Sequence, residues 1–185
     1  MPSDQILDVE KSLLLIVDIQ EAFLPVVSKM KRVVERSRIL IEAANLLQLP
    51  VFVSQQYPQG LGPTVEPLKQ VLNGNCHGFD KVEFSCCRDE KMAEAIAQSG
   101  RTHILLAGVE THVCIAQTAL DLLALDKQPY VILDAVSARH GRDHDVALNR
   151  LTAAGAILTT AEAAILELTR TAKHPAFKAI SHLIK

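Results

Sequence analysis

The chain has 185 residues, of which 49% are hydrophobic, and a formal net charge of -2 at pH 7. This length and a mean hydropathy of +0.18 favour one domain, residues 1–185, with a sizeable core. The near-neutral charge and the lack of a basic run argue against nucleic acid as a partner. The longest apolar runs are far too short to span a membrane.

The amino-terminal segment MPSDQILDVEKS has no basic stretch followed by a long apolar one, so we expect no secretory signal and a cytoplasmic protein. The four cysteines are Cys76, Cys86, Cys87 and Cys114. They lack C-x-x-C spacing, which favours reduced thiols over a disulfide framework. Cys86 and Cys87 need no role beyond packing, although either is oxidisable if exposed.

Segments with strand and helix patterns alternate along the chain, which is typical of a parallel sheet covered on both faces. The predicted strands are Leu13–Asp18, Val51–Ser54, a segment after Lys81, His103–Ala107, Tyr130–Leu133 and Ile157–Thr159. The predicted helices are Ser28–Leu47, Asp89–Gln98, Val113–Leu125, Asp143–Ala154 and Ala161–Leu168, with a short helix or arm after Lys173. The Gly/Pro-rich loop Gln55–Val65 leaves the carboxyl end of a strand, where loops often carry function.

The segment Leu105–Ala119, LLAGVETHVCIAQTA, is the most informative part of the chain. Its apolar run ends at Gly108, and Cys114 opens a run with helical periodicity. This pattern predicts a strand, a tight turn and a cysteine on the first turn of a helix. Such a position lowers the pKa of a thiol and favours a developing oxyanion. On this segment alone, a buried Cys114 that serves only as a small hydrophobe is an equal alternative.

Two further motifs support chemistry at this cysteine. Asp18 ends the apolar run LLLIVDI, where an acid is costly unless it is paired. At the carboxyl end of a parallel strand, it faces the crevice in which such sheets bind ligands. The motif GFDKVEFSCC places Lys81 ahead of Phe84 and Ser85. The alternatives are a structural salt bridge for Asp18 and a solvated surface side chain for Lys81.

These three motifs, in this order, resemble the isochorismatase-like cysteine hydrolases. In that family the nucleophilic cysteine follows a G-x-E-x-x-V-C-like turn, an aspartate ends the first strand, and a lysine precedes an F-S-like pair. The matching residues are Cys114, Asp18 and Lys81. The resemblance continues through LDAVSAR and AGAILTTAEAAILEL. It implies a Rossmann-like three-layer α/β/α sandwich with a six-stranded parallel sheet.

The resemblance also implies a role for each residue. Asp18 is the base, Lys81 positions Asp18 and stabilises the thiolate, and Cys114 is the nucleophile. A cis peptide between Val109 and Glu110 is implied, with the backbone N–H groups of Val113 and Cys114 forming an oxyanion hole. An ordinary trans turn is the alternative. His112 is interpreted as a turn or interface residue, because the family assigns the base role to the aspartate.

The same comparison separates the chain from two branches of the superfamily. Nicotinamidases carry an Asp-x-His-His-like metal set after the second strand, but Gln55–Gly60 has neither histidine nor carboxylate. We therefore expect no metal and no cofactor. Isochorismatases that cleave a vinyl ether often have glycine at the nucleophile position, so Cys114 argues against that reaction. The loop SQQYPQGLGPTV looks most like the isochorismatase-domain-containing proteins of animals and their bacterial relatives.

The sequence therefore predicts a metal-independent cysteine hydrolase that cleaves a small amide-like C–N bond through a thioester. A reactive-thiol redox protein and a non-enzymatic interaction protein on the same fold are the alternatives. The predicted walls of the substrate pocket are Phe23, Tyr57, Leu61 and Phe84.

Structural roles are expected for four residues near the site, with Asp134 at a strand end and Asp143 as a helix cap. The other two are Ser137 and Arg139.

A homo-oligomer is expected, because the helix Val113–Leu125 is apolar on most sides and needs other elements packed against both of its faces. The tail Lys173–Lys185 is a possible second contact, unless it covers its own domain.

Overall fold

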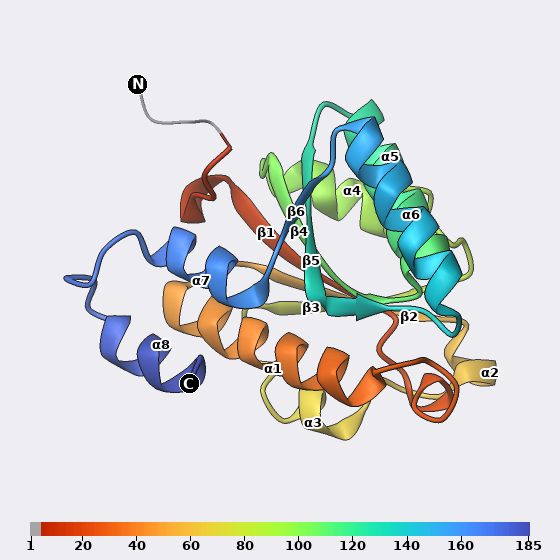
Figure 1. Ribbon diagram of the computed structural model, residues 1–185, viewed down its shortest axis with the longest axis horizontal. Helices are drawn as coiled ribbons and strands as arrows, with labels where there is room; N and C mark the ends of the chain where they lie inside the picture. Colours follow the sequence, from red (N-terminus) through yellow and green to blue (C-terminus); the bar gives the residue numbers. More distant parts are fainter. Residues whose placement is uncertain (1–4) are drawn as a thin grey trace.

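The computed structural model describes residues 5–185 and contains a six-stranded parallel sheet (Figure 1). The strand order is β3-β2-β1-β4-β5-β6. The strands are β1 (Ser12–Val17), β2 (Val51–Gln56), β3 (Cys76–Lys81), β4 (His103–Val109), β5 (Gln128–Ser137) and β6 (Ile157–Thr159). Helices cover both faces, so the predicted three-layer α/β/α fold is confirmed.

Figure 1 shows two helical layers on opposite sides of the sheet. One layer holds α1 (Met30–Leu47), α3 (Glu66–Lys69), α7 (Ala161–Thr169) and α8 (Phe177–Leu183). The other holds α4 (Glu90–Gln98), α5 (Ala116–Ala124) and α6 (Gly141–Ala154). The short helices are η1 (Val9–Lys11), η2 (Glu21–Phe23), α2 (Pro58–Leu61) and the π-helical turn η3 (Thr111–Ile115).

Strand β1 is buried along its whole length and connects two hydrophobic cores. Leu14 and Ile16 pack into the core under α1 and α7, whereas Leu13, Leu15 and Val17 pack into the core under α4 and α5. This alternation follows from the two-residue period of a strand. The carboxyl end of β1 is therefore held from both sides, and Asp18 comes directly after it.

Several predicted boundaries differ from the structure. Lys81 ends strand β3 and does not precede a strand, because this exposed edge strand has too few apolar residues to show a pattern. Strand β5 continues to Ser137, so Asp134 lies within the strand. Helix α6 begins at Gly141 after His140, with no side-chain cap. Asp143 thus lies in the first turn of the helix and does not cap it.

The predicted helix Val113–Leu125 is divided between two elements. Cys114 lies in the π-helical turn η3, and the α-helix α5 begins only at Ala116. Gly108, at the end of β4, has a φ of +126°, and a Cβ atom there would lie 2.0 Å from the carbonyl oxygen of Val17. Only glycine allows β4 to approach the end of β1 this closely.

The apolar surfaces expected to face a partner subunit are covered by the chain itself. On helix α5, Ala119 and Leu122 are fully buried, and the helix packs on the sheet and α6. In the tail, Ile180 of α8 is buried in the core beside α1. Leu125, just past α5, remains exposed. None of the helices within residues 5–185 is long and apolar enough to span a membrane.

Candidate active site

A buried ion pair between Asp18 and Lys81 forms the centre of the candidate site. Asp18 follows β1 with a left-handed backbone, φ 53°. The Nζ atom of Lys81, at the end of β3, donates to Oδ2 of Asp18 at 2.8 Å, and both side chains are fully buried. The hydroxyl of Ser54 donates to Oδ1 at 2.7 Å. Both carboxylate oxygens are therefore hydrogen-bonded, as a buried charge requires.

Lys81 has further acceptors besides Asp18. Its Nζ lies 2.7 Å from Oε1 of Gln56, 3.1 Å from the carbonyl oxygen of Glu83 and 3.3 Å from that of Phe84. The sequence analysis missed both Ser54 and Gln56. The sequence carried a signal for them, because Ser54 and Gln56 are two residues apart at the end of β2 and therefore lie on the same face of the strand.

Cys114 lies in the same buried region, which favours the protonated form of its thiol. Burial raises the pKa of Cys114, the negative charge of Asp18 and a hydrogen-bonding interaction with that carboxylate raise the pKa further, and Lys81 opposes them. The expectation that this turn lowers the thiol's pKa was therefore wrong. Burial and the adjacent carboxylate outweigh the lysine and the helix start.

The ammonium group of Lys81 is stabilised in its charged form. Burial by itself would lower the pKa of Lys81, but the charge of Asp18 and the hydrogen bond to it act in the opposite direction, and the pKa is raised. Cys86 is fully buried, and burial raises its pKa to about 11. The site thus holds one carboxylate, one ammonium group and two neutral thiols.

The turn that carries Cys114 is held by Glu110. The peptide bond between Val109 and Glu110 is cis. The buried carboxylate of Glu110 accepts from the backbone N–H of Arg139 at 2.8 Å and from its Nε at 3.0 Å. The carbonyl oxygen of Glu110 accepts from the N–H of Val113 at 3.0 Å. That N–H is therefore engaged within the turn, whereas the sequence analysis expected it to face an oxyanion.

His112 faces helix α6. Its Nε2 atom lies 4.0 Å from Oδ2 of Asp143. This position agrees with its interpretation as a turn residue. Arg139 stabilises the turn through Glu110, and Asp134 accepts a hydrogen bond from the N–H of Ala161 at 2.8 Å. Ser137 donates from its hydroxyl to the carbonyl oxygen of Ser28.

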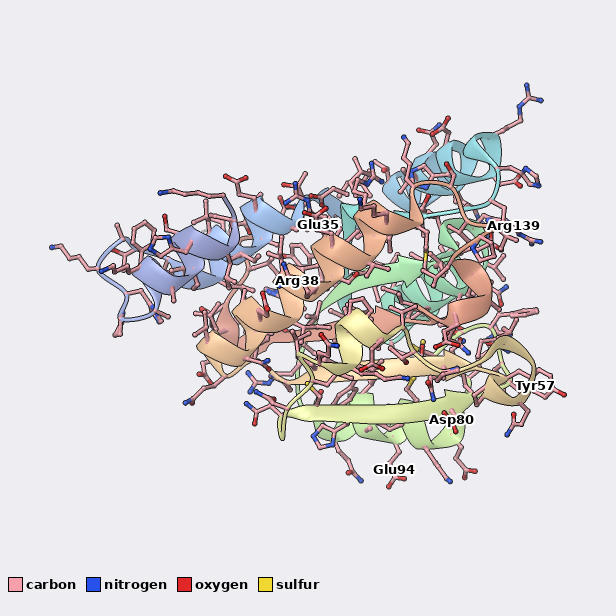
Figure 2. All side chains as sticks on the ribbon, turned by 90° about the horizontal axis from the view of Figure 1, so that it is seen from below. Glu35, Arg38, Tyr57, Asp80, Glu94 and Arg139 are labelled. Carbon is pink, nitrogen blue, oxygen red and sulfur yellow. The ribbon has the colours of Figure 1, made fainter. Side chains whose placement is uncertain are left out.

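The four residues predicted to form the pocket walls differ in their exposure and in their position relative to the buried pair. Tyr57 projects outward (Figure 2), is 52% exposed and shares a cavity of about 180 Å³ with Lys81. Phe84 is 53% exposed. Phe23 is half-buried and packs against the core, and Leu61 is half-buried on α2. Only Tyr57 shares this cavity with a residue of the buried pair.

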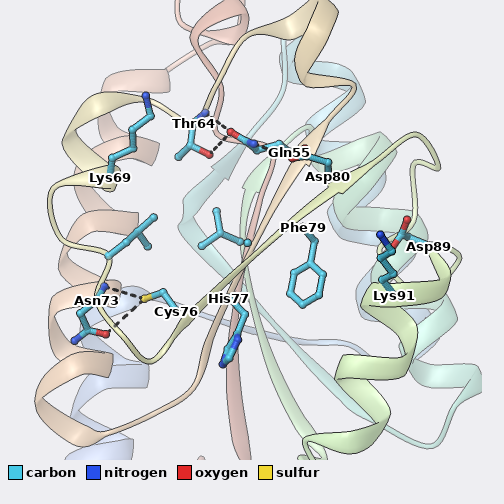
Figure 3. A pocket seen from close by; sticks show the side chains of 13 residues that line it. Gln55, Thr64, Lys69, Asn73, Cys76, His77, Phe79, Asp80, Asp89 and Lys91 are labelled. Atoms are coloured by element: carbon cyan, nitrogen blue, oxygen red, sulfur yellow. Dashed lines mark hydrogen bonds between the residues drawn. The ribbon is translucent and has the colours of Figure 1, made fainter.

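A cavity of about 590 Å³ follows the exposed edge strand β3, between α3 and α4 (Figure 3). Gln55 spans part of it, accepting from Thr64 and donating to Asp80 at 2.8 Å. Neither Asp18 nor Cys114 lines this cavity. Among residues 5–185, no three His, Cys, Asp or Glu side chains are grouped so that they could hold a metal ion.

The fold and the sequence place this chain in one class of α/β proteins. The family model of the isochorismatase domain matches residues 12–163. Isochorismatase domain-containing protein 1 of Danio rerio is 40% identical over 168 residues, which cover 91% of this chain and 59% of the relative. The chain thus spans about three fifths of that relative's length. The chain belongs to the isochorismatase family, as predicted, and this membership supports a hydrolase.

Solved structures agree with this assignment. The structure of the MAR1 ribonuclease from Caenorhabditis elegans superimposes with a TM-score of 0.91 at 39% identity, covering 96% of this chain and 91% of that one. The YcaC gene product of Escherichia coli, described as an octameric hydrolase of unknown specificity, has a TM-score of 0.91 at 23% identity, covering 100% and 91%. The second likeness is evidence for the fold alone.

Proposed function

We propose that this chain is a cysteine hydrolase that cleaves a small amide-like C–N bond without a metal. The observation that carries the proposal is the fully buried Asp18–Lys81 pair next to Cys114. Asp18 is the carboxylate whose charge and hydrogen-bonding interaction act on this thiol. It is therefore the group that can accept the proton when the thiol attacks.

The first half of the reaction forms a thioester. Asp18 takes the proton of Cys114 while the sulfur attacks the substrate's carbonyl carbon. The ammonium group of Lys81 offsets the negative charge as it moves from carboxylate to sulfur. We assign the oxyanion to the backbone N–H of Cys114. When the C–N bond breaks, the protonated Asp18 gives its proton to the departing nitrogen.

The second half restores the enzyme. Asp18, again a carboxylate, takes a proton from water as the water oxygen attacks the thioester carbon. The C–S bond then breaks, and the proton returns to the sulfur of Cys114. In each half, Asp18 accepts one proton and then gives it up, so the site needs no other acid or base. The loop Gln55–Gly60 offers only amide, phenol and backbone groups, and no step requires a metal.

A substrate panel of small amides, hydroxamates and ureides tests the proposal, with release of ammonia or amine as the readout. The wild-type chain should release amine from at least one member, and Cys114→Ala should abolish the release. Cys76→Ala is the matched control, since Cys76 lies at the opposite end of strand β3 from Lys81. A covalent adduct at Cys114 in intact-mass spectra would identify the thioester. Turnover that survives Cys114→Ala, or is lost on chelation, would overturn the proposal.

The same experiments also test the alternatives of RNA cleavage and of a reactive thiol without hydrolysis. The relative from Caenorhabditis elegans is described as a ribonuclease, so a single-stranded RNA belongs in the panel. Oxidation of Cys114 by dilute peroxide without turnover of any amide would favour the reactive-thiol alternative. We expect amide turnover and no RNA cleavage, because the net charge of -2 gives a polyanion little attraction.

We also propose that the chain forms a homo-oligomer around this end of the sheet. Exposed apolar side chains lie on three loops there. They are Leu24 and Val26 after η2, Tyr57 after β2, and Val82 and Phe84 after β3. Apolar clusters of this kind mark protein contacts.

A further inference from the structure

A separate cavity of about 360 Å³ is lined by residues from the beginnings of α1 and α6 and from the end of β5. Figure 1 shows where these three elements lie in the fold. Neither the Asp18–Lys81 pair nor Cys114 lines the cavity. The proposed hydrolysis therefore makes no use of this cavity.

Three basic side chains line this cavity: Lys29, Arg32 and His144. The Nε atom of Arg32 is buried and has no hydrogen-bond partner, and Nη2 makes a long contact of 3.4 Å with the carbonyl oxygen of Val136. A buried donor without a partner is costly. Burial lowers the pKa of His144, the charge of Asp145 opposes this shift, and the charges of Arg32 and Lys29 lower the pKa further.

The acidic residues of the cavity do not balance these charges. Asp134 is already engaged, because its Oδ1 accepts from the N–H of Ala161 at 2.8 Å and its Oδ2 lies 3.4 Å from Arg36. Asp145 is exposed, and it partly offsets Arg32 and Lys29 at His144. Because Asp134 is paired with Arg36, the charged side chains of Lys29 and Arg32 face one solvated carboxylate, which leaves the cavity suited to an anion.

The backbone adds positive potential at the same place. Helix α1 has 18 residues and begins after Lys29 with neither a side-chain cap nor an acidic residue in its first turn. Helix α6 has 14 residues and begins at Gly141, also without a side-chain cap. Gly141 and Lys29 both line the cavity. The positive end of the α1 dipole therefore supplements the basic side chains, whereas Asp143 in the first turn of α6 offsets that helix's contribution.

We propose that this cavity binds a phosphate monoester. A phosphate carries close to two negative charges and three strong acceptor oxygens. Arg32 and Lys29 would donate to these oxygens, as would His144 from its Nε2 atom. A carboxylate carries only one negative charge, so it gains less from the two cationic side chains. A volume of about 360 Å³ exceeds a phosphate group, so the cavity also accommodates the ligand's organic part.

The cavity is connected to the candidate active site by one hydrogen bond. The Nδ1 atom of His144 lies 2.9 Å from the hydroxyl of Thr111. Thr111 begins the π-helical turn that contains Cys114. A ligand that contacts His144 is therefore connected to this turn through the hydrogen bond between His144 and Thr111.

Isothermal titration calorimetry of the full chain with inorganic phosphate and with phenyl phosphate tests the proposal, with sodium acetate as the carboxylate probe. We expect one phosphate site per chain, tighter binding of phenyl phosphate, and weaker binding of acetate. The double variant Lys29→Gln/Arg32→Gln should raise the dissociation constant at least tenfold.

The matched control is Lys31→Gln/Arg38→Gln, which removes the same charge from the same helix at positions outside the cavity (Figure 2 labels Arg38). Its dissociation constant should equal that of the wild type. If the double variant fails to fold, Lys29→Gln alone must still weaken binding, because Lys29 is exposed. Absence of binding, equal weakening in the control, or acetate binding as tightly as phosphate would each overturn the proposal. These measurements need no hydrolytic turnover, so they are independent of the proposed function.

Discussion

The Nζ atom of Lys81 lies 2.8 Å from Oδ2 of Asp18 across 63 residues of sequence, and neither side chain is exposed to solvent. The two residues come from the ends of β1 and β3, which are separated in the sheet by β2. On the intervening strand, Ser54 donates a hydrogen bond to Asp18, and Gln56 accepts one from Lys81. The carboxylate beside Cys114 is therefore held in place by its counter-ion and by the strand between them.

Breaking this pair should destabilise the fold strongly. Lys81→Met leaves the buried carboxylate without its counter-ion, which costs about 3–5 kcal/mol of unfolding free energy. The double variant Asp18→Asn/Lys81→Met should recover much of that loss, since asparagine tolerates the left-handed backbone at this position. Urea denaturation followed by circular dichroism measures all three proteins.

Lys69→Met is the control for this experiment. Lys69 forms an exposed ion pair with Glu66 at 3.6 Å, so its loss should cost less than about 1 kcal/mol. If Lys81→Met costs no more unfolding free energy than Lys69→Met, the Asp18–Lys81 pair does not stabilise the fold.

Removing the carboxylate should separate the reactivity of Cys114 from hydrolysis. Asp18 raises the pKa of Cys114 and Lys81 lowers it, so Asp18→Asn should lower the pKa and increase the thiolate fraction at neutral pH. Alkylation of Cys114 by iodoacetamide should become faster, while amide turnover is lost because no group remains to carry the proton. Peptide mass mapping after brief labelling measures the rate.

Cys87 provides an internal reference in the same labelling experiment. Burial raises its pKa to about 12, and Asp18 is not among the groups that act on it. Its alkylation rate should therefore be equal in the wild type and Asp18→Asn. Slower labelling of Cys114 in the variant would show that Asp18 promotes thiolate formation in the resting protein, contrary to this prediction.

Much of the fold was predictable because β1, β2 and β4 are buried and apolar, and the helices between them keep their period. Strand β3 was not, because an exposed edge strand with the sequence CHGFDK shows no apolar alternation. For the site, motif order indicated Asp18, Lys81 and Cys114. The direction of the thiol's pKa shift could not be predicted, because it depends on burial and on a carboxylate 96 positions away in sequence.

The phosphate cavity should also make stability depend on pH. The pKa of His144 lies below its usual value of about 6.5, because burial, Arg32 and Lys29 disfavour the charged ring, while Asp145 opposes them. The unfolded chain thus binds the proton more readily, so stability falls as the pH drops from the unfolded pKa through the lower folded one.

His144→Gln should therefore lose less unfolding free energy between pH 7 and pH 5 than the wild type does. Urea denaturation at both pH values measures the difference. His182→Gln, an exposed histidine on α8, is the control and should follow the wild type. A loss in His144→Gln equal to that of the wild type would show that this ring does not carry the effect.

Assembly should depend on the apolar side chains around the candidate site. Val82 is 66% exposed and Phe84 is 53% exposed, and both follow β3 within three residues of Lys81. Burying them against another copy would remove apolar area from water, which stabilises the contact by about 25 cal/mol per Å². A lysine at either position would instead place a charge in the contact.

Light scattering at micromolar concentration should give a multiple of 20.2 kDa for the wild type and a smaller mass for Val82→Lys/Phe84→Lys. Leu166→Lys, at an exposed apolar position on α7, should keep the wild-type mass. A wild-type mass of one chain, or equal dissociation by the control, would contradict an assembly built on this surface.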